Sequence, residues 1–244
     1  MLRDPELHHA PVWVALPFTV TKSVTNLGSL TELGLIRRTL TFMNTNVLAS
    51  IMSGLPKDHP LPSEFDALAK AIKECHRCEG LNIEGETEAA PGFGNLSAKI
   101  MVVGQSLCSK CMETQVPFTG GSGRLLDLAL EKSNLRKTDI FVTNVVHCHT
   151  KGNRKSFPHE IANCREYLMK EIEMVKPRAI IALGKDAVSS FLGPEAWPSE
   201  VGKRVVQPSY VVYPNYHPSY IMKLGKNRVT TYIQTLSEIL RIEA

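Results

Sequence analysis

The feature that most constrains the fold is a regular alternation of short β-branched runs and amphipathic segments between about residues 99 and 242. The runs are Lys99–Val103, Ile140–Thr143, Ala179–Leu183 and Tyr210–Tyr213. The helical patterns fall at about 122–133, 158–175, 185–191 and 229–242. Short apolar strands that alternate with helices indicate βαβ units, in which parallel strands are covered by helices on both faces. We therefore predict a three-layer α/β/α fold around a central, mostly parallel four-stranded sheet.

The beginning of the chain reads differently and indicates an N-terminal extension. Residues 1–62 carry scattered prolines and short apolar patches, with a helix-like stretch at about 30–52. This pattern assigns the extension no role. A helix is expected next, over residues 64–73, with Ser63 as its cap. The main domain is therefore expected to span residues 63–244.

Composition excludes several classes of protein. A chain of 244 residues that is 43% hydrophobic and 21% charged can bury a full core. Its apolar runs fall short of the roughly 20 residues that a membrane span needs, and its start lacks the order of a signal peptide. We therefore expect an intracellular protein of the cytoplasm or nucleoid, without a membrane partner and monomeric. The net charge of +4 is mild, and a basic surplus over 201–244 suits either a polyanion or a solvated face.

Four cysteines have the spacing of metal ligands. Cys75 and Cys78 form a C-x2-C clip that can place two thiolates on one metal, whereas Cys148 and Cys164 can join them only through folding. In a reducing compartment clustered cysteines are more often metal ligands than disulfides. Thiolates suit zinc and iron–sulfur clusters about equally, so ligand chemistry alone leaves the metal open.

A second pairing of cysteines is also compatible with the spacing. Cys108 and Cys111 form another C-x2-C clip, and together with Cys75 and Cys78 this clip resembles a zinc ribbon with an overlong spacer. If they bind no metal, Cys108 and Cys111 are small, buried apolar residues, the commoner fate of free cysteines. A disulfide between them is a further alternative, which a reducing compartment disfavours.

Polar and glycine-rich segments lie where the predicted strands end. Asn144 ends the second strand and His217 follows the fourth, and in a parallel sheet these ends meet at one edge. Taken singly, either residue is more often a turn or a structural side chain. The segment 116–124, which contains Phe118, is rich in glycine that would let backbone approach a phosphate. Phe118 itself suits either a base-stacking platform or the core.

Taken in order, these motifs resemble the iron–sulfur uracil-DNA glycosylases called family 4, within the uracil-DNA glycosylase superfamily. The resemblance covers about residues 70–242. Its motifs are the Cys75/Cys78 clip, Gly104, Pro117-Phe118-x-Gly120-x-x-Gly123, Thr143-Asn144-Val145-Val146-x-Cys148, Gly152-Asn153-Arg154, Cys164-Arg165-x-Tyr167-Leu168, Pro177-x-x-Ile180-x-Ala182-Leu183-Gly184 and His217-Pro218-Ser219-Tyr220. It implies a [4Fe-4S] cluster on Cys75, Cys78, Cys148 and Cys164, and DNA containing uracil or a related lesion as partner.

The resemblance also implies roles for residues of this chain. Such enzymes rotate the target nucleotide out of the stack into a pocket. Phe118 would stack on the flipped base, Asn144 would read its edge, and His217 would donate to O2 as the glycosidic bond breaks. The backbone around Gln105 and Ser106 would assist at O2. Arg154 and Ser219 are expected to contact DNA. Ile221 or Met222 is the candidate wedge between bases, and Lys223 would contact a phosphate.

The loop after the first strand departs from the family pattern. Family members typically read Gly-Glu-x-Pro-Gly there, whereas this chain reads Gly104-Gln105-Ser106-Leu107-Cys108. A neutral glutamine can position water but cannot deprotonate it. We therefore expect reduced uracil excision, an altered substrate range, or catalysis by another group such as Glu113. The alternatives are a DNA- or lesion-binding relative with weak or no turnover, and a cluster protein with unrelated redox or sensing work.

Two further expectations follow from the family pattern. Cys108 replaces a glycine near the 5-position of the pyrimidine, where a side chain would exclude the thymine methyl or adjust the room for a 5-substituted uracil. The covalently trapping relatives carry an additional basic, His-containing insertion. Residues 151–157 show no such insertion, so no stable DNA–protein crosslink is expected.

Overall fold

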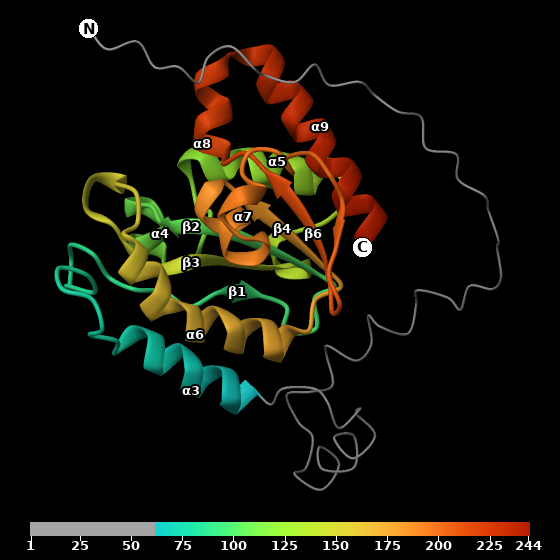
Figure 1. Cartoon of the computed structure of the whole chain (residues 1–244). Coiled ribbons are helices and arrows are strands. Elements are labelled where there is room, and N and C mark those ends of the chain that lie inside the picture. Colours follow the sequence, from blue (N-terminus) through green and yellow to red (C-terminus); the bar gives the residue numbers. More distant parts are fainter. Residues whose placement is uncertain (1–61) are drawn as a thin grey trace, which may run out of the picture. The chain divides into compact units, whose positions relative to one another are not determined.

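The computed structural model describes residues 62–244 of the chain (Figure 1). The expected extension, with its helix-like stretch at about 30–52, lies outside the described residues except for Pro62. The helices are α3 (Pro62–Lys73), α4 (Ser109–Thr114), α5 (Arg124–Lys132), α6 (Pro158–Val175), α7 (Lys185–Leu192), α8 (Pro218–Ile221) and α9 (Lys226–Glu243). The strands are β1 (Phe93–Gly94), β2 (Ile100–Leu107), β3 (Phe141–His149), β4 (Ala179–Leu183), β5 (Val205–Val206) and β6 (Val211–Asn215). Short 3-10 turns occur at Gly121–Gly123, Lys137–Asp139, Lys151–Asn153, Pro194–Ala196 and Met222–Leu224.

The strands form one sheet in the order β1-β3-β2-β4-β6-β5. The four predicted strands are its centre, and β3, β2, β4 and β6 pair in parallel. The predicted α/β class with a mostly parallel sheet is confirmed. The sheet has six strands rather than four, because β1 and β5 extend its two edges by antiparallel pairing. Each edge strand has only two residues, too few for an alternation of side chains to be visible in the sequence.

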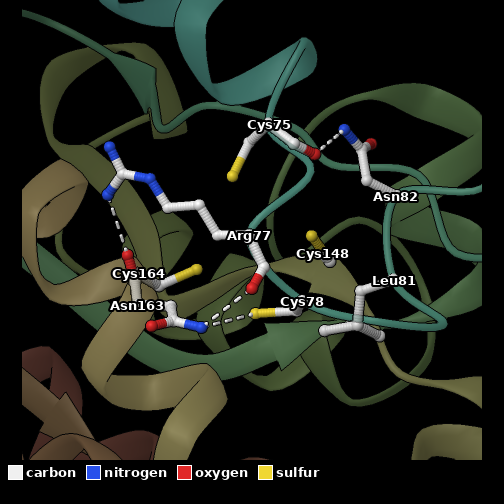
Figure 2. A pocket seen from close by; sticks show the side chains of 8 residues that line it. All are labelled: Cys75, Arg77, Cys78, Leu81, Asn82, Cys148, Asn163 and Cys164. Carbon is white, nitrogen blue, oxygen red and sulfur yellow. Dashed lines mark hydrogen bonds between the residues drawn. The ribbon is translucent and has the colours of Figure 1, made fainter.

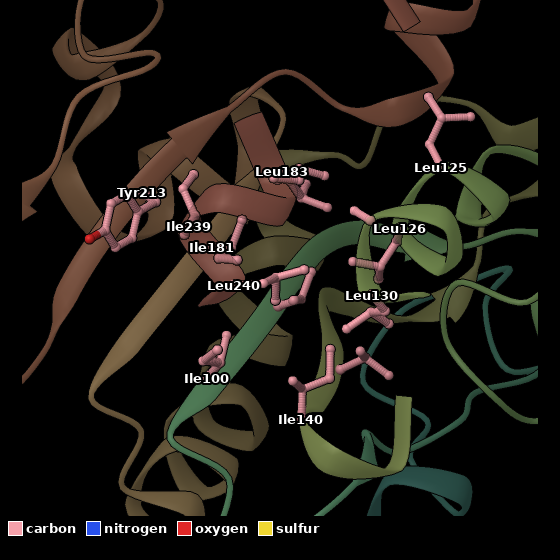
Figure 3. Packing of buried hydrophobic residues seen from close by; sticks show 14 of the residues in the cluster. Ile100, Leu125, Leu126, Leu130, Ile140, Ile181, Leu183, Tyr213, Ile239 and Leu240 are labelled. Atoms are coloured by element: carbon pink, nitrogen blue, oxygen red, sulfur yellow. The ribbon is translucent and has the colours of Figure 1, made fainter. Parts of the chain in front are cut away.

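Helices cover both faces of the sheet, because successive side chains of a strand point to opposite sides. Ile100 and Val102 of β2 pack in the cluster formed with α5 and α9, which Figure 3 shows from close by. Met101 and Val103, their neighbours along the strand, pack in a second cluster with α6 and α7. All four side chains are almost completely buried. These two apolar layers hold the three-layer arrangement together.

The parallel strands run in the same direction, so their carboxyl halves lie at one side of the sheet. Gly104 of β2 lies opposite Asn144 of β3 in the strand register. The prediction that the strands end at these residues is wrong, because β2 and β3 continue to Leu107 and His149, where they still pair.

On the other side of the sheet's centre, the Gly184 N–H after β4 donates to the carbonyl of Asn215 in β6 at 2.8 Å. His217 follows two residues later and begins α8 as its N-cap. The carboxyl side of the strands is where open α/β sheets bind ligands.

Among the helices of residues 62–244, none combines the length and apolar character required to cross a membrane.

Candidate active site and cysteine pocket

The candidate pocket begins where Asn144 and Phe118 converge on Gly104. A Cβ atom added to Gly104 would lie 2.5 Å from Asn144 Oδ1 and 2.7 Å from Phe118 Cζ. Real Cβ atoms essentially never approach so closely, so these two side chains occupy their positions only because residue 104 is glycine. Both are buried, with Asn144 4% and Phe118 7% exposed. The fold therefore brings together an amide and an aromatic ring that are 26 residues apart in sequence.

The backbone of Phe118 is held in an unusual conformation. Its φ angle is +59°, in the left-handed region that bulky residues rarely adopt. Lys137 Nζ donates to the Phe118 carbonyl at 2.9 Å and pairs with the Asp127 carboxylate at 2.9 Å. A Cβ on Gly123 would lie 2.1 Å from the same carbonyl oxygen, so glycine is required there too. Sequence reasoning missed Lys137, because nothing in its local pattern distinguishes it from a surface lysine.

His217 lies across the pocket from these residues. Its ring centroid is 6.5 Å from that of Phe118, with an angle of 27° between the rings. Nδ1 accepts the backbone N–H of Ser219 at 3.3 Å, and the Ser219 hydroxyl lies 2.8 Å from the same atom. A neutral ring that accepts at Nδ1 carries its proton on Nε2. Burial lowers the pKa of His217 to about 4, which keeps the ring neutral near pH 7.

Gln105 and Ser106 directly follow Gly104 in β2 and are half-buried. Gln105 Nε2 donates to the Arg154 carbonyl at 3.4 Å, and the Ser106 hydroxyl is 3.5 Å from that of Thr150. Both side chains thus contact the segment that follows β3. Glu113, considered as a replacement acid, is exposed on α4, where its carboxylate is 2.7 Å from Lys110 Nζ.

The residues expected to meet DNA differ in their exposure. Ser219, Met222 and Lys223 are exposed on α8 and the turn after it. Ile221 is only 5% exposed and packs in the core with α5 and α9. Met222, which is 50% exposed, is thus the wedge candidate that stays at the surface.

Arg154 is engaged within the protein itself. Its Nη1 donates to the carboxylate of Glu160 at 2.9 Å, and its guanidinium lies 4.1 Å from the centroid of the Phe157 ring. The Glu160 side chain is 1% exposed, so the arginine neutralises a buried charge. The guanidinium therefore holds the segment after β3 against α6.

The four predicted ligand cysteines line one pocket, as Figure 2 shows. Cys75 and Cys78 come from the loop after α3, Cys148 from β3 and Cys164 from α6. All four are free thiols. Asn163 Nδ2 donates to Cys78 Sγ at 3.4 Å and to the Arg77 carbonyl at 3.0 Å. Within residues 62–244, no three His, Cys, Asp or Glu side chains are grouped so that they could hold a metal ion.

Cys108 and Cys111 form a separate pair. Their sulfur atoms are 2.6 Å apart at the start of α4, and neither residue lines the pocket of the other four cysteines. The arrangement therefore supports the quartet with Cys148 and Cys164 rather than the pairing that resembles a zinc ribbon.

A buried polar network behind the site was not visible in the sequence. Glu171 of α6, 0% exposed, accepts the Thr143 hydroxyl at 2.6 Å and the Gly92 N–H at 2.7 Å, and lies 3.2 Å from His147 Nε2. Burial alone would lower the pKa of His147, but the Glu171 carboxylate raises it to about 10. The network ties β3 to α6 beneath Asn144. Its members are too far apart in sequence for spacing to reveal them.

The relationship of this chain to known proteins agrees with the site. Residues 91–240 match the pattern of the uracil DNA glycosylase superfamily. A type-4 uracil-DNA glycosylase of Thermotoga maritima is 31% identical over 177 residues, which cover 68% of this chain and 86% of the relative. Those of Pyrobaculum aerophilum and Archaeoglobus fulgidus are 36% and 34% identical, each over 50% of this chain and 61% of the relative.

The chain therefore belongs to the uracil-DNA glycosylase superfamily. Within it, the resemblance to the type-4 family that the motifs predicted is confirmed.

Proposed function

We propose that this protein is a monofunctional uracil-DNA glycosylase, which flips uracil or a close analogue out of DNA and hydrolyses its N-glycosidic bond to leave an abasic site. The observation that carries this function is the convergence of Asn144 and Phe118 on Gly104, with His217 facing them across the pocket. An aromatic ring, an amide and a neutral imidazole are the groups needed to stack, read and release a pyrimidine.

Base recognition follows from the buried amide of Asn144. Its oxygen can accept from N3–H of uracil while its nitrogen donates to O4. Cytosine reverses these two groups, so binding cytosine would leave buried donors and acceptors unpaired. Such a mismatch rejects the wrong base more strongly than a change of shape does. Phe118 provides the stacking surface, in a conformation held by Lys137 and Gly123.

Release of the base follows from the tautomer of His217. The Ser219 N–H occupies Nδ1, so the Nε2 proton is available to donate to O2. Negative charge gathers on O2 as the glycosidic bond breaks, and a donor already oriented toward that atom stabilises the leaving group. The low pKa keeps the ring in this neutral form near pH 7.

The attacking water would be positioned by neutral groups. Gln105 stands where family members carry glutamate, and its amide contacts the Arg154 carbonyl. A carboxylate can accept a proton from water, whereas an amide and the Ser106 hydroxyl only position it. Leaving-group stabilisation by His217 and Asn144 would then supply most of the rate enhancement. This substitution is the specific observation that favours the second candidate function, lesion binding with weak or no turnover.

The cysteine pocket fits the [4Fe-4S] cluster of the family. The four cysteines line one pocket, where Asn163 also donates to Cys78 Sγ. Four cysteine thiolates are the ligand set that such a cluster takes. Cys75, Cys78, Cys148 and Cys164 would hold it. When bound, the cluster supplies a structural cross-link between three segments of the chain.

One experiment tests the substrate and separates the two candidate functions. The full chain is incubated with matched single- and double-stranded oligonucleotides that carry uracil, hypoxanthine, 5-hydroxymethyluracil or a thymine mispair, and abasic sites are counted. We expect the wild-type chain to excise uracil. Asn144→Ala should lower this excision roughly a hundredfold, because losing the hydrogen bonds that read the base costs about 3 kcal/mol. Tight binding to uracil DNA without abasic sites, unchanged in His217→Ala, would instead establish the lesion-binding function.

A further inference from the structure

The Cys108–Cys111 pair at the start of α4 is not explained by the active site or by the cysteine pocket. Both residues are free thiols, and their sulfur atoms lie 2.6 Å apart. That is closer than ordinary non-bonded contact between sulfur atoms and leaves little movement before a bond could form. Cys108 is partly exposed, whereas Cys111 is 4% exposed. One sulfur can therefore meet a reagent from solvent while the other waits beside it.

The surroundings of the pair favour a thiolate. Cys108 Sγ accepts the backbone N–H of Cys111 at 3.2 Å and shares a hydrogen bond with Cys111 Sγ. The hydrogen bond from Cys108 lowers the pKa of Cys111 to about 6, so the pair gives up its first proton more readily than an isolated thiol. The same hydrogen bond raises the pKa of Cys108, so the first proton leaves Cys111. Because the two sulfurs are in contact, transfer of the remaining proton from Cys108 to Cys111 places the negative charge on the half-buried Cys108.

The pair is also coupled to the candidate pocket. The Thr119 carbonyl lies 3.8 Å from Cys108 Sγ and 3.7 Å from Cys111 Sγ, with both thiols placed as donors. Thr119 directly follows Phe118, the ring that would stack on the base. Cys108 directly follows the end of β2, which carries Gln105. A change at the two sulfurs is therefore transmitted to both sides of the pocket.

We propose that Cys108 and Cys111 form a redox-active dithiol site whose substrate is a small disulfide, and that its oxidation lowers uracil excision. The Cys108 thiolate attacks one sulfur of the small disulfide, forming a mixed disulfide and expelling one thiolate. Cys111 then attacks Cys108 Sγ and expels the second. The protein loses two electrons and two thiol protons, which appear on the two small thiols.

The loss of excision follows from the donors that oxidation removes, and this part rests on the proposed function. A disulfide has no S–H group, so the Thr119 carbonyl loses the thiol proton that the reduced pair can donate to it. The backbone beside Phe118, already in a left-handed conformation, then loses part of its support. We expect excision to fall roughly tenfold, since misplacing a positioning group by about 1 Å can cost up to a hundredfold.

The chain offers a direct readout of the bond, because Lys110 lies between the two cysteines. Trypsin separates residues 100–110 from residues 111–124, so a Cys108–Cys111 disulfide appears as two linked peptides in a mass spectrum. The full-length protein is treated with oxidised glutathione, alkylated and digested, and uracil excision is measured on the same samples. The same digest reports whether Cys75, Cys78, Cys148 or Cys164 has changed.

The expected result is a linked peptide pair with roughly tenfold lower excision, both reversed by dithiothreitol. Cys111→Ser should form no linked pair and should instead keep glutathione on Cys108, which the digest shows as a mass increase on the peptide of residues 100–110. Should that variant fail to fold, Cys108→Ser should show neither the linked pair nor an adduct on that peptide. Thiols that stay reduced, a linked pair with unchanged excision, or a Cys111→Ser variant without the adduct would overturn the proposal. A reduced protein that excises no uracil would instead contradict the proposed function, while the linked peptides would still decide whether the dithiol reacts.

Discussion

At the scale of single residues, the candidate pocket depends on the absence of a side chain at Gly104. An added methyl group would overlap Asn144 Oδ1 and Phe118 Cζ, so Gly104→Ala must displace the groups that read and stack the base. We predict that this variant loses roughly a hundredfold in uracil excision, the cost of misplacing positioning groups by about 1 Å. Single-turnover excision measures the effect.

A matched glycine variant separates this local effect from a loss of stability. Gly85 has a positive φ angle, +71°, which Gly104 does not have, and an added Cβ at Gly85 would meet nothing within 4 Å. Gly85→Ala should therefore lower the thermal midpoint through backbone strain while leaving excision unchanged. Equal activity of Gly104→Ala and the wild-type chain would show that Asn144 and Phe118 do not act from their observed positions.

The pH dependence of excision reports the state of His217. Because burial lowers its pKa to about 4, the neutral ring persists well below pH 6. Excision should stay flat as pH falls from 8 toward 5 and then decline toward pH 4, as protonation of Nδ1 removes the acceptor of the Ser219 N–H. The unfolded chain protonates first, near 6.5, so acid also reduces the free energy of unfolding. Circular dichroism at each pH separates the two effects, and a decline centred near 6.5 in folded protein would contradict the assigned pKa.

Gln105 offers a gain-of-function test. Gln105→Glu restores an acid directly after Gly104, and a positioned general base typically contributes about a hundredfold or more. We predict at least roughly tenfold faster uracil excision, because the new carboxylate no longer donates to the Arg154 carbonyl and is free to turn toward water. Gln115→Glu on the far side of α4 is the control. A slower Gln105→Glu enzyme would indicate that the amide itself positions the water.

At the scale of elements, the loop between β2 and α5 is held by a side chain from another element. Lys137, in the 3-10 turn before β3, joins the Phe118 carbonyl to Asp127 of α5 and is only 17% exposed. This contact fixes the stacking ring relative to the sheet. A half-buried ammonium with two partners contributes more than an exposed ion pair does.

We predict that Lys137→Met lowers kcat for uracil excision roughly tenfold, since the ring is misplaced rather than removed. Lys137→Arg, which keeps the charge, should recover part of this loss. The control is Lys170→Met, which breaks the exposed pair with Glu166 on α6. Steady-state kinetics of the folded variants measure the effect. A wild-type kcat in Lys137→Met would show that Lys137 does not hold Phe118 in position.

The central strands were predictable because each contains a short, mostly apolar run of buried residues, which two covered faces demand. Parallel pairing predicts that Asn144 and His217 lie toward the same side of the sheet, although Asn144 lies within β3 rather than at its end. Three features could not be predicted, because each depends on partners distant in sequence. They are the two-residue edge strands, the contact of Lys137 with the Phe118 carbonyl, and the Glu171 network. The burial of Ile221, a candidate wedge, could not be predicted for a similar reason, since its neighbours in the core come from α5 and α9.

At the scale of the whole described domain, the cysteine pocket joins three segments of the chain. Cys75 and Cys78 follow α3, whereas Cys148 and Cys164 belong to the sheet and to α6. A bound cluster would thus stabilise the domain without touching the base. Cys148→Ser should abolish the visible absorption of an iron–sulfur protein and lower the thermal midpoint. Cys108→Ser, outside this pocket, should keep both properties, and a colourless, zinc-loaded wild-type protein would contradict the assigned cluster.

The most direct test of the central claim is the rate of abasic-site formation in a uracil-containing oligonucleotide under single-turnover conditions, for the full chain and for His217→Ala. The pocket of Asn144, Phe118 and His217 predicts measurable release of uracil by the wild-type chain. It also predicts a rate roughly a hundredfold lower in the variant, as expected when a donor to a developing anion is removed. Absence of abasic sites with the wild-type chain, or equal rates for the two proteins, would contradict the account.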